Sequence, residues 1–550
     1  MGLSVRARRL RDLFFVTLSA ALLAAPYHRG ELGGLAFVAF LPYLAVLDSR
    51  SSSEAFRASF LFGFLFYLGI GYPLILVSWV GYVALAAYLA LYFGLAGLLS
   101  ARWMDPSAEL AVTVYRRNVR SLFVVPAVWV LFEYARGWAL SGAPLAFLGY
   151  SQWKNLPLIQ IADVTGVYGV SYLVVFVNLA LYKLLRELRG RPAAAGSGGA
   201  PPLSSPGISR RRYAATLALL AAAALGGTAL YGTAVLGLRD APPDPARPKA
   251  VLRVSVVQGN IPQDQKWDAR IKSIIFEKYK RLTLMAALEK PDLILWPETS
   301  FPGYLEDETL LAAGLRSLAR HAGADVLVGA PTLGDIESQG VRFYNSAVLL
   351  APDGTEKGRY SKLHLVPFGE YVPFEPLFGA VRRFVDIGAF SPGREHTLFR
   401  AVSYHRERRI EAKFAALICY EDMFPGLVRR FRREGADFLV NITNDAWFGP
   451  TVAAAIHGQA SVFRAVENRI PVVRAANTGW SSFISPEGRI LGAVSDGGRE
   501  LFVTGHATRD LVLRRGTSFY TRFGDVFVLL LVVLCAMAYR DHTRQAYSRL

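Results

Sequence analysis

A thiol, an ammonium group and several carboxylates stand at the ends of short apolar runs in the second half of the chain. Glu298 follows DLILWP, Lys362 lies within RYSKLHLVPFGEYVPF, and Cys419 follows KFAALI. Active residues of α/β proteins are commonly found at the carboxyl ends of sheet strands. A thiol can act as a nucleophile, a carboxylate as its base and an ammonium group as the stabiliser of an oxyanion. Together the three residue types indicate nucleophilic catalysis through sulfur.

Each of these residues also has a structural interpretation. Buried cysteines are common and mostly inert, and Lys362 would serve equally well as a solvated strand end. Glu298 would begin a loop, and Glu370 and Glu421 would occupy a turn or cap a helix. Taken singly, the structural interpretation is preferred for all of them except Cys419, where the two balance. The functional interpretation rests on their occurrence together.

The segments around these residues predict a layered α/β domain over residues 250–510. Runs that are apolar throughout and rich in Val, Ile and Leu suit strands buried on both faces, with helices packed between them. We expect strands in VLRVSVVQGN, DLILWPE, ADVLVGAP, FYNSAVLL, KFAALICYE, ADFLVNITN and PVVRAANTG. Helices are expected at Lys266 to Leu288, Thr309 to His321, Phe424 to Glu434 and Ala453 to Asn468. The sixth run ends in two more polar residues, Asn444 and Asp445.

The first 240 residues have the pattern of a membrane domain. A helix needs roughly 20 apolar residues to cross the hydrocarbon layer of a bilayer. Seven such stretches occur before residue 240, and an eighth lies at residues 524–540. They are Leu13 to Tyr27, Leu32 to Leu47, Phe60 to Val77, Tyr82 to Leu99, Leu122 to Tyr134, Val167 to Leu184, Tyr213 to Leu236 and Val526 to Tyr539. The first would also suit a cleavable signal peptide, but the later spans favour an uncleaved anchor.

The basic residues fix an expected orientation. The net charge of +18 comes largely from Arg and Lys in the loops that follow the second, fourth, sixth and eighth stretches, and from the N-terminus. Lys and Arg near span ends are retained in the cytoplasm, so the α/β domain is expected on the outer side. Because this bias accounts for much of the charge, we do not expect a nucleic-acid partner.

Several chemistries lack their sequence signatures. The 550 residues contain two cysteines, Cys419 and Cys535, which excludes a disulfide scaffold and a cysteine-rich metal centre. The eight histidines do not form an H-E-x-x-H motif, and neither G-x-S-x-G nor a P-loop occurs. We therefore expect no metal ion and no cofactor.

Five motifs occur in an order that resembles a known family. Together with the flanking spans, these motifs are similar to those of the apolipoprotein N-acyltransferases. The motifs are VVQGNIPQDQKWD, LWPETSFP, KLHLVPFGEYVPF, CYE and NDAWFG. This family belongs to the nitrilase, or carbon-nitrogen hydrolase, superfamily, whose fold is an αββα sandwich. The resemblance implies a catalytic triad of Glu298 as base, Lys362 as stabiliser of the tetrahedral intermediate and Cys419 as nucleophile.

The resemblance extends to further positions. It implies supporting roles and lipid contacts for residues around the triad. The supporting residues are Glu370, Tyr420, Glu421 and Asn345, and the substrate-binding residues are Trp267, Trp447 and Phe448. Glu370 and Glu421 are alternative partners for Lys362, whose ammonium group is expected to lower the pKa of Cys419.

The resemblance also implies an activity and a location. The acyl donor would be a membrane phospholipid, the acceptor the α-amine of a diacylglyceryl-modified cysteine on an apolipoprotein, and the intermediate a thioester. The enzyme would be a monomer in the bacterial inner membrane, with its catalytic domain in the periplasm. Two alternatives remain: a membrane-tethered amidase or nitrilase that hydrolyses a C–N bond, and a transporter with an inert outer domain. The spans lack a run of intramembrane charges, which disfavours the transporter.

Overall fold

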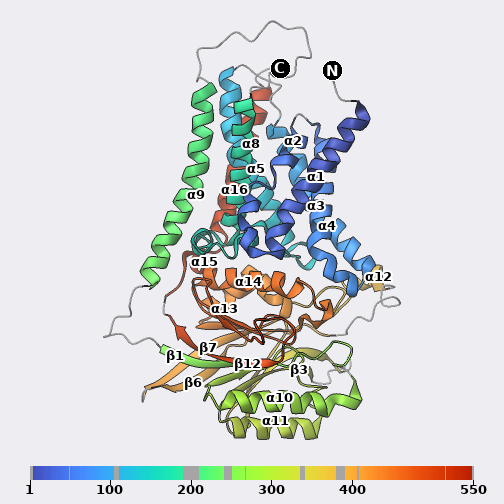
Figure 1. Cartoon of the computed structure of the whole chain (residues 1–550), viewed down its shortest axis with the longest axis vertical. Coiled ribbons are helices and arrows are strands. Elements are labelled where there is room, and N and C mark those ends of the chain that lie inside the picture. The colour runs from blue at the N-terminus through green and yellow to red at the C-terminus, as the bar shows by residue number, and fades with distance from the viewer. Residues whose placement is uncertain are drawn as a thin grey trace. The chain divides into compact units, whose positions relative to one another are not determined.

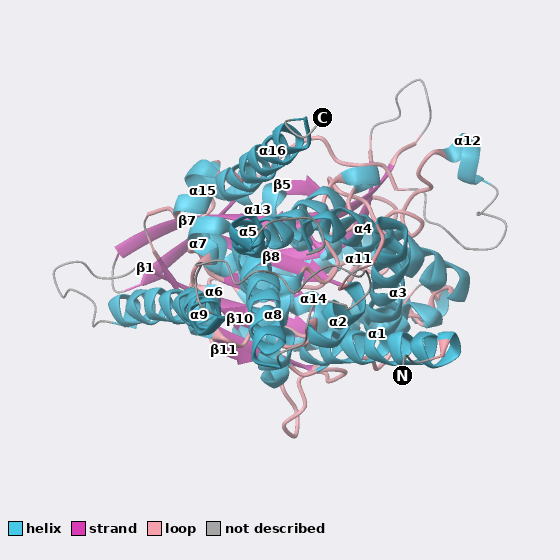
Figure 2. Ribbon diagram, turned by 90° about the horizontal axis from the view of Figure 1, so that it is seen from above, coloured by secondary structure: helices cyan, strands magenta, loops and turns pink. Residues whose placement is uncertain are grey.

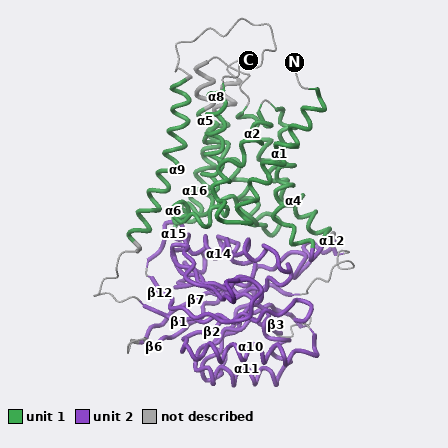
Figure 3. The backbone as a smooth tube through the Cα atoms, in the orientation of Figure 1, with its two compact units in different colours: residues 1–75, 79–240, 523–550 green, residues 76–78, 241–522 purple. Residues whose placement is uncertain are grey.

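The chain forms two compact units, which Figure 3 shows in different colours. The computed structural model describes residues 4–48, 50–104, 111–189, 210–240, 250–266, 268–334, 341–379, 390–405, 408–514 and 516–547. The first unit comprises residues 1–75, 79–240 and 523–550, and the second comprises residues 76–78 and 241–522. Within the described ranges, all strands fall in the second unit and are drawn in magenta in Figure 2.

The first unit is helical. Its longer helices begin and end as follows: α1 Val5–His28, α3 Ser52–Gly71, α4 Trp79–Met104, α5 Ala111–Arg136, α8 Val167–Arg189, α9 Arg210–Asp240 and α16 Val526–Tyr547. They are connected by short α-helices and 3₁₀ turns. The short helices are α2 (Leu41–Leu47), α6 (Leu156–Ile159) and α7 (Ala162–Thr165), and the four 3₁₀ turns are η1 (Gly30–Phe37), η2 (Tyr72–Leu76), η3 (Ala139–Ser141) and η4 (Leu148–Gln152). The N-terminus of α3 carries a capping box in which Ser51 and Glu54 satisfy each other's backbone N–H groups.

Six helical segments within the described residues are long and apolar enough to cross a membrane. Two of the predicted spans differ from this set, because α5 is not among the six and α16 is represented only by a shorter apolar helix, Val526–Arg540. The predicted second span is not one α-helix: it consists of η1 followed by α2. The presence of several apolar helices is confirmed, and a total of eight spans stays a prediction.

The second unit contains two six-stranded sheets. The first has the order β12-β1-β2-β3-β4-β5 and the second β11-β10-β9-β8-β7-β6. The first sheet is built from β1 Ala250–Gln258, β2 Leu293–Leu295, β3 Asp325–Leu333, β4 Phe343–Leu350, β5 Glu356–Ser361 and β12 Gly505–Leu513. The second is built from β6 Phe399–His405, β7 Arg408–Ile418, β8 Phe438–Thr443, β9 Val472–Ala476, β10 Ser482–Ile484 and β11 Ile490–Ala493.

The centre of each sheet is parallel and its margins are antiparallel. In the first sheet β1, β2 and β3 run parallel, and in the second β7, β8 and β9 do so. These central strands are almost wholly buried, which explains why their sequences are apolar on both faces. Because parallel strands end at the same edge, the residues after β2, β7 and β8 are brought to equivalent edges of the two sheets.

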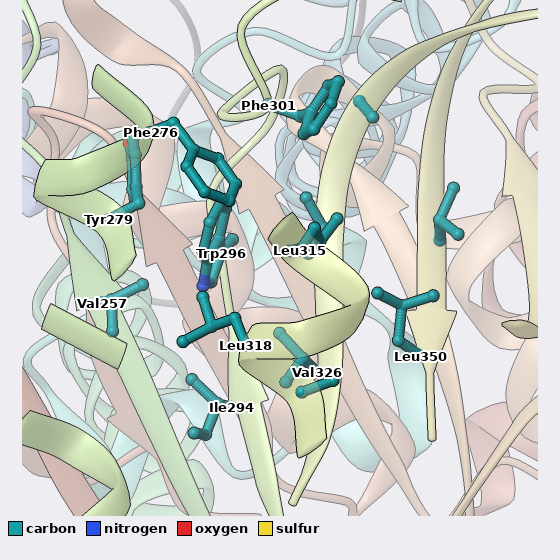
Figure 4. Close-up of a cluster of buried hydrophobic side chains, with 14 of the residues drawn as sticks. Val257, Phe276, Tyr279, Ile294, Trp296, Phe301, Leu315, Leu318, Val326 and Leu350 are labelled. Atoms are coloured by element: carbon teal, nitrogen blue, oxygen red, sulfur yellow. The ribbon is translucent and has the colours of Figure 1, made fainter. Parts of the chain in front are cut away.

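Helices cover the outer face of each sheet (Figure 1). Helices α10 (Lys272–Ala287) and α11 (Thr309–Ala322) lie on one side, and α13 (Pro425–Arg433) and α14 (Ala453–Asn468) on the other. The core under α10 and α11 includes Trp296, which stacks on Tyr279 at a ring-centroid distance of 4.9 Å (Figure 4). The indole N–H of Trp296 donates to Thr283, so its polar atom is satisfied within the core. The predicted αββα layering is confirmed.

Candidate active site

Glu298 is held at the end of β2 by a close approach between neighbouring strands. A Cβ atom added to Gly329 on β3 would lie 2.2 Å from the carbonyl oxygen of Pro297 and 2.7 Å from the Cα of Glu298. Only glycine leaves this space to the backbone of the acid. Thr299, the next residue, has φ of +44°, which is rare for a β-branched side chain. The turn that presents Glu298 is therefore both tightly packed and strained.

The Glu298 carboxylate accepts hydrogen bonds on both oxygens. Asn345 Nδ2 donates to Oε1 at 2.7 Å, and the backbone N–H of Asn444 donates to Oε2 at 2.9 Å. Lys362 Nζ lies 3.7 Å from Oε1. Glu298 is only 7% exposed, so these contacts replace the water that an exposed carboxylate would bind. The two sheets thus share the acid, since Asn345 lies on β4 and Asn444 follows β8.

Lys362 follows β5 and is bound mainly by Glu370. Its Nζ lies 2.8 Å from Glu370 Oε2, and Asn345 Nδ2 also donates to Glu370 Oε1 at 2.9 Å. Burial by itself lowers the pKa of Lys362, but attraction to Glu370 and Glu298 more than reverses this, and the pKa is raised. Lys362 is therefore a permanent cation. The question of its carboxylate partner, open at the level of sequence, is answered by the 2.8 Å contact with Glu370.

Cys419 begins the turn η7 (Cys419–Met423) after β7, with φ of +53°. Its carbonyl oxygen accepts from Asn441 Nδ2 at 2.9 Å and lies 3.2 Å from His457 Nε2. A non-glycine residue in the left-handed region is costly and is found where the surrounding structure over-determines it. Here the two contacts to the carbonyl hold the backbone that carries the thiol.

The thiol of Cys419 is electrostatically coupled to both other residues of the predicted triad. Burial raises its pKa well above the ordinary value, the Glu298 carboxylate raises it further, and Lys362 opposes both. Lys362 lowers the pKa of Cys419, as expected from the sequence, but the net pKa of the thiol is raised. The ammonium group does favour the thiolate, but loss of hydration and the adjacent anion outweigh it.

Glu421 fastens the turn of Cys419 to the segment that follows Lys362. One carboxylate oxygen accepts from the Tyr360 hydroxyl at 2.8 Å and from the backbone N–H groups of Leu363 and His364 at 2.7 and 3.0 Å. The other accepts from the N–H of Ile418 at 2.7 Å. Burial raises the pKa of Glu421 to about 7. Its position is that of a clamp between two strand ends rather than of a direct partner of Lys362.

The predicted aromatic residues have different surroundings. The ring of Tyr420 packs against Phe424 with centroids 4.9 Å apart. Trp447 and Phe448 lie in the turn η8 (Asp445–Phe448), where Trp447 is exposed and Phe448 is half-buried. Trp267 lies outside the described residues. Trp447 is the exposed member of this pair, and its substrate contact stays a prediction.

A buried cluster behind Cys419 was not foreseen from the sequence. His457 on α14 lies with Nδ1 3.1 Å from Asp445 Oδ1 and Nε2 3.0 Å from Asp422 Oδ1, and Arg474 Nη1 is 2.9 Å from Asp422 Oδ2. Burial lowers the pKa of His457, but attraction to Asp422 reverses this and raises the pKa to about 9. The sequence held one signal, a histidine and an arginine within otherwise apolar elements. No role is predicted for either of them from the sequence.

Lys266 is a second missed residue. It lies in the motif VVQGNIPQDQKWD, in which a role is predicted only for the tryptophan. Its Nζ donates to the backbone carbonyl oxygen of Glu298 at 2.9 Å, and it is 5% exposed. Two lysines therefore approach the acid, Lys362 from β5 and Lys266 from the loop after β1.

The arrangement can transfer a proton from sulfur to a carboxylate next to a fixed cation. Such a set supports attack on a carbonyl carbon and stabilisation of the resulting oxyanion. Among the described residues, no group of three His, Cys, Asp or Glu side chains is placed to hold a metal ion.

Comparison with known proteins assigns the chain. The carbon-nitrogen hydrolase family matches residues 253–515, and the apolipoprotein N-acyltransferase N-terminal domain matches residues 19–180. The chain is 36% identical to the apolipoprotein N-acyltransferase of Geobacter metallireducens over 96% of both chains. It is 37% identical to that of Methylococcus capsulatus over 80% of this chain and 79% of the other. Among solved structures, an amidase from Nesterenkonia sp. is 21% identical over 48% of this chain and 90% of its own, with a TM-score of 0.34. The chain belongs to the apolipoprotein N-acyltransferase family.

Proposed function

We propose that this protein N-acylates apolipoproteins, with a membrane phospholipid as acyl donor and a thioester on Cys419 as intermediate. The proposal rests above all on one observation: a partly exposed thiol, a carboxylate and a permanent cation are electrostatically coupled in one site of a member of this family. Glu298 is the base, Lys362 the oxyanion stabiliser and Cys419 the nucleophile. Family membership supports the acceptor, and the apolar helices support a lipid donor.

The first half-reaction forms the thioester. Glu298 takes the proton of Cys419 as the sulfur attacks the ester carbonyl carbon of the phospholipid. Lys362 stabilises the negative charge on the carbonyl oxygen. The C–O bond to the glycerol then breaks, and Glu298 returns the proton to the leaving oxygen, releasing a lysophospholipid. Because the raised pKa of Cys419 keeps it a thiol at rest, proton transfer accompanies the attack.

The second half-reaction transfers the acyl group to nitrogen. The free α-amine of a diacylglyceryl-modified cysteine attacks the thioester carbon, and Glu298 accepts a proton from that nitrogen. The C–S bond breaks, sulfur takes the proton from Glu298, and an N-acylated lipoprotein leaves. Dividing the transfer in two predicts ping-pong kinetics.

The other groups around the triad have positioning roles in this mechanism. Glu370 orients Lys362, Asn345 orients both Glu298 and Glu370, and Glu421 fixes the turn that carries Cys419. Tyr420, Trp267, Trp447 and Phe448 are proposed to contact the acyl chains or their surroundings. We propose a location in the bacterial inner membrane with the second unit in the periplasm, as the distribution of Arg and Lys predicts, and a monomeric enzyme.

Intact-mass spectrometry of the purified protein after incubation with phospholipid vesicles tests the proposal. We expect a gain of one acyl group on Cys419, its absence in Cys419→Ser, and its removal by a diacylglyceryl peptide with a free α-amine. Cys535→Ser is the matched control, because it removes the other thiol, in α16, and should keep the adduct. A wild-type protein that gains no acyl mass but releases ammonia from small amides would instead be a membrane-tethered amidase.

A further inference from the structure

Lys266 occupies an unusual place for a lysine. Lysine is almost never fully buried unless it is paired with an acid. The side chain of Lys266 is 5% exposed, and its hydrogen bond goes to a main-chain oxygen, that of Glu298, at 2.9 Å. Among the described residues no carboxylate oxygen lies within ion-pair distance of its Nζ, whereas Lys362 has Glu370 at 2.8 Å. The cost of burying this cation is therefore only partly offset.

The loop that carries Lys266 is fastened to the site at several points. The N–H of Asn260 donates to the carbonyl of Asn477 at 2.8 Å, and the N–H of Ile261 donates to Asn477 Oδ1 at 2.9 Å. Gln263 Oε1 accepts from Asn444 Nδ2 at 2.8 Å. Asn444 is also the residue whose backbone N–H contacts the Glu298 carboxylate. The loop thus reaches Glu298 by two routes.

The charge of Lys266 depends on pH in the physiological range. Burial lowers its pKa to about 7, against electrostatic attraction to Glu298 after β2 and to Cys419 at the start of η7. Below this pH the ammonium form carries a positive charge that interacts electrostatically with both groups. Above it the neutral amine keeps a donor for the Glu298 carbonyl but loses the charge.

We propose that Lys266 is a positioning residue for the base Glu298 and supplies a second positive charge to the formation of the Cys419 adduct. The inference rests on the proposed function and deepens it. The hydrogen bond from Lys266 fixes the backbone of Glu298. The positive charge of Lys266 stabilises the negative charge of the site, which lies on Glu298 at rest and on the adduct once the thiol proton has moved to Glu298. Lys362 alone carries this charge when Lys266 is neutral.

Three variants in a Cys535→Ser background of the full chain test the proposal. Lys266→Met removes the charge, Lys266→Arg keeps a charge that does not titrate, and Lys280→Met is the control on an exposed lysine of α10. Two rates at Cys419 are measured between pH 6 and 8.5: acylation by phospholipid vesicles and alkylation by iodoacetamide. The melting temperature of each variant is measured in parallel.

We expect Lys266→Met to slow both rates about tenfold at pH 6, which is the effect of about one pKa unit at the thiol. Its deficit should shrink as the pH rises through about 7, because the wild type then loses the same charge. Lys266→Arg should retain most of the rate without this change in ratio, and Lys280→Met should match the wild type. The melting temperature of Lys266→Met should not fall, since an incompletely paired buried cation is removed.

Two results would overturn the inference. The first is that Lys266→Met reacts at wild-type rates at every pH. The second is that Lys266→Met and Lys266→Arg are slowed equally at every pH and melt at lower temperatures than the wild type, which would indicate that Lys266 contributes only to packing. The proposed function fails separately: the wild type would then gain no acyl group, while alkylation by iodoacetamide would still report on Lys266.

Discussion

Substitution of Gly329 by alanine tests whether the position of Glu298 controls the reaction. The new Cβ would lie 2.2 Å from the Pro297 carbonyl oxygen, 2.7 Å from the Cα of Glu298 and 2.8 Å from the N of Thr299. Ordinary contact begins at 3.4 Å, so the strand end must move by about 1.2 Å (3.4 − 2.2). All three neighbouring atoms belong to the backbone, and no flexible side chain can absorb the shift.

The displacement has two separable consequences. Overpacking of a well-packed core costs about 1–3 kcal/mol in the free energy of unfolding. A shift of about 1 Å in a reacting group costs about 100-fold in rate. The hydrogen bonds of the Glu298 carboxylate to Asn345 and Asn444, at 2.7 and 2.9 Å, cannot both survive such a shift. We therefore expect Gly329→Ala to fold but to acylate Cys419 about 100-fold more slowly.

The rate of Cys419 acylation by phospholipid vesicles, followed by intact mass, measures this effect, and a thermal melt measures folding. Gly426→Ala is the matched control: Gly426 lies in the first turn of α13, and a Cβ there would meet nothing within 4 Å. It should leave the rate unchanged. Gly329→Ala with a wild-type acylation rate would refute the argument that this close approach sets the geometry of the base.

Two further predictions follow from the buried charges. Glu370→Gln removes the 2.8 Å partner of Lys362, so the free energy of unfolding should fall by about 3–5 kcal/mol, as for other broken buried ion pairs. Acylation should fail first at alkaline pH, because the raised pKa of Lys362 is lowered. A thermal melt measures the first effect and a pH–rate profile the second, and an unchanged profile contradicts the assignment of Glu370 as the partner of Lys362. His457→Gln should destabilise the second unit by about 3 kcal/mol at pH 6, estimated from a rise in pKa from 6.5 to about 9. Because the pKa of His457 is higher in the folded state, this contribution is complete below pH 6.5 and is lost as the pH rises through about 9. The melting temperatures of the wild type and of His457→Gln should therefore converge as the pH is raised. A difference that stays constant with pH would mean that His457 is neutral in the fold.

Local pattern was sufficient for the strands that are buried on both faces and for most helices. The apolar runs predicted β1–β4 and β7–β9, and the predicted helix at Ala453 to Asn468 matches α14. Strands such as β5 and β12 have exposed, charged positions and lie at sheet margins, so their sequences carry no continuous apolar signal. Their pairing, as of β12 with β1, joins residues about 250 positions apart and cannot be deduced from local sequence.

The start of α10 shows how tertiary contacts override a local pattern. We expected a helix from Lys266, but α10 begins at Lys272. Lys266 is held by Glu298, and the Asp268 side chain accepts from the N–H of Arg270 to begin a separate 3₁₀ turn, η5 (Ala269–Ile271). Asp268 has an extended backbone, with φ of −72° and ψ of 113°, which separates the loop from α10. The site depends in the same way on distant partners: the sequence named Glu370 and Glu421, but only the folded chain places one at Lys362 and the other at the turn of Cys419.

The balance of charge in the site explains why the proposed nucleophile, Cys419, is a thiol at rest. Lys362 already neutralises Glu370 at 2.8 Å and lies 3.7 Å from Glu298, so a thiolate would be a third anion around one permanent cation. Moving the thiol proton to Glu298 during attack avoids this, because one negative charge is lost as another forms on the adduct. The number of buried anions then stays constant, and the cost of desolvating a new charge does not arise. A site built in this way favours attack on a carbonyl group, which receives the negative charge as the thiol proton moves to Glu298, over reaction with an electrophile that requires a preformed thiolate.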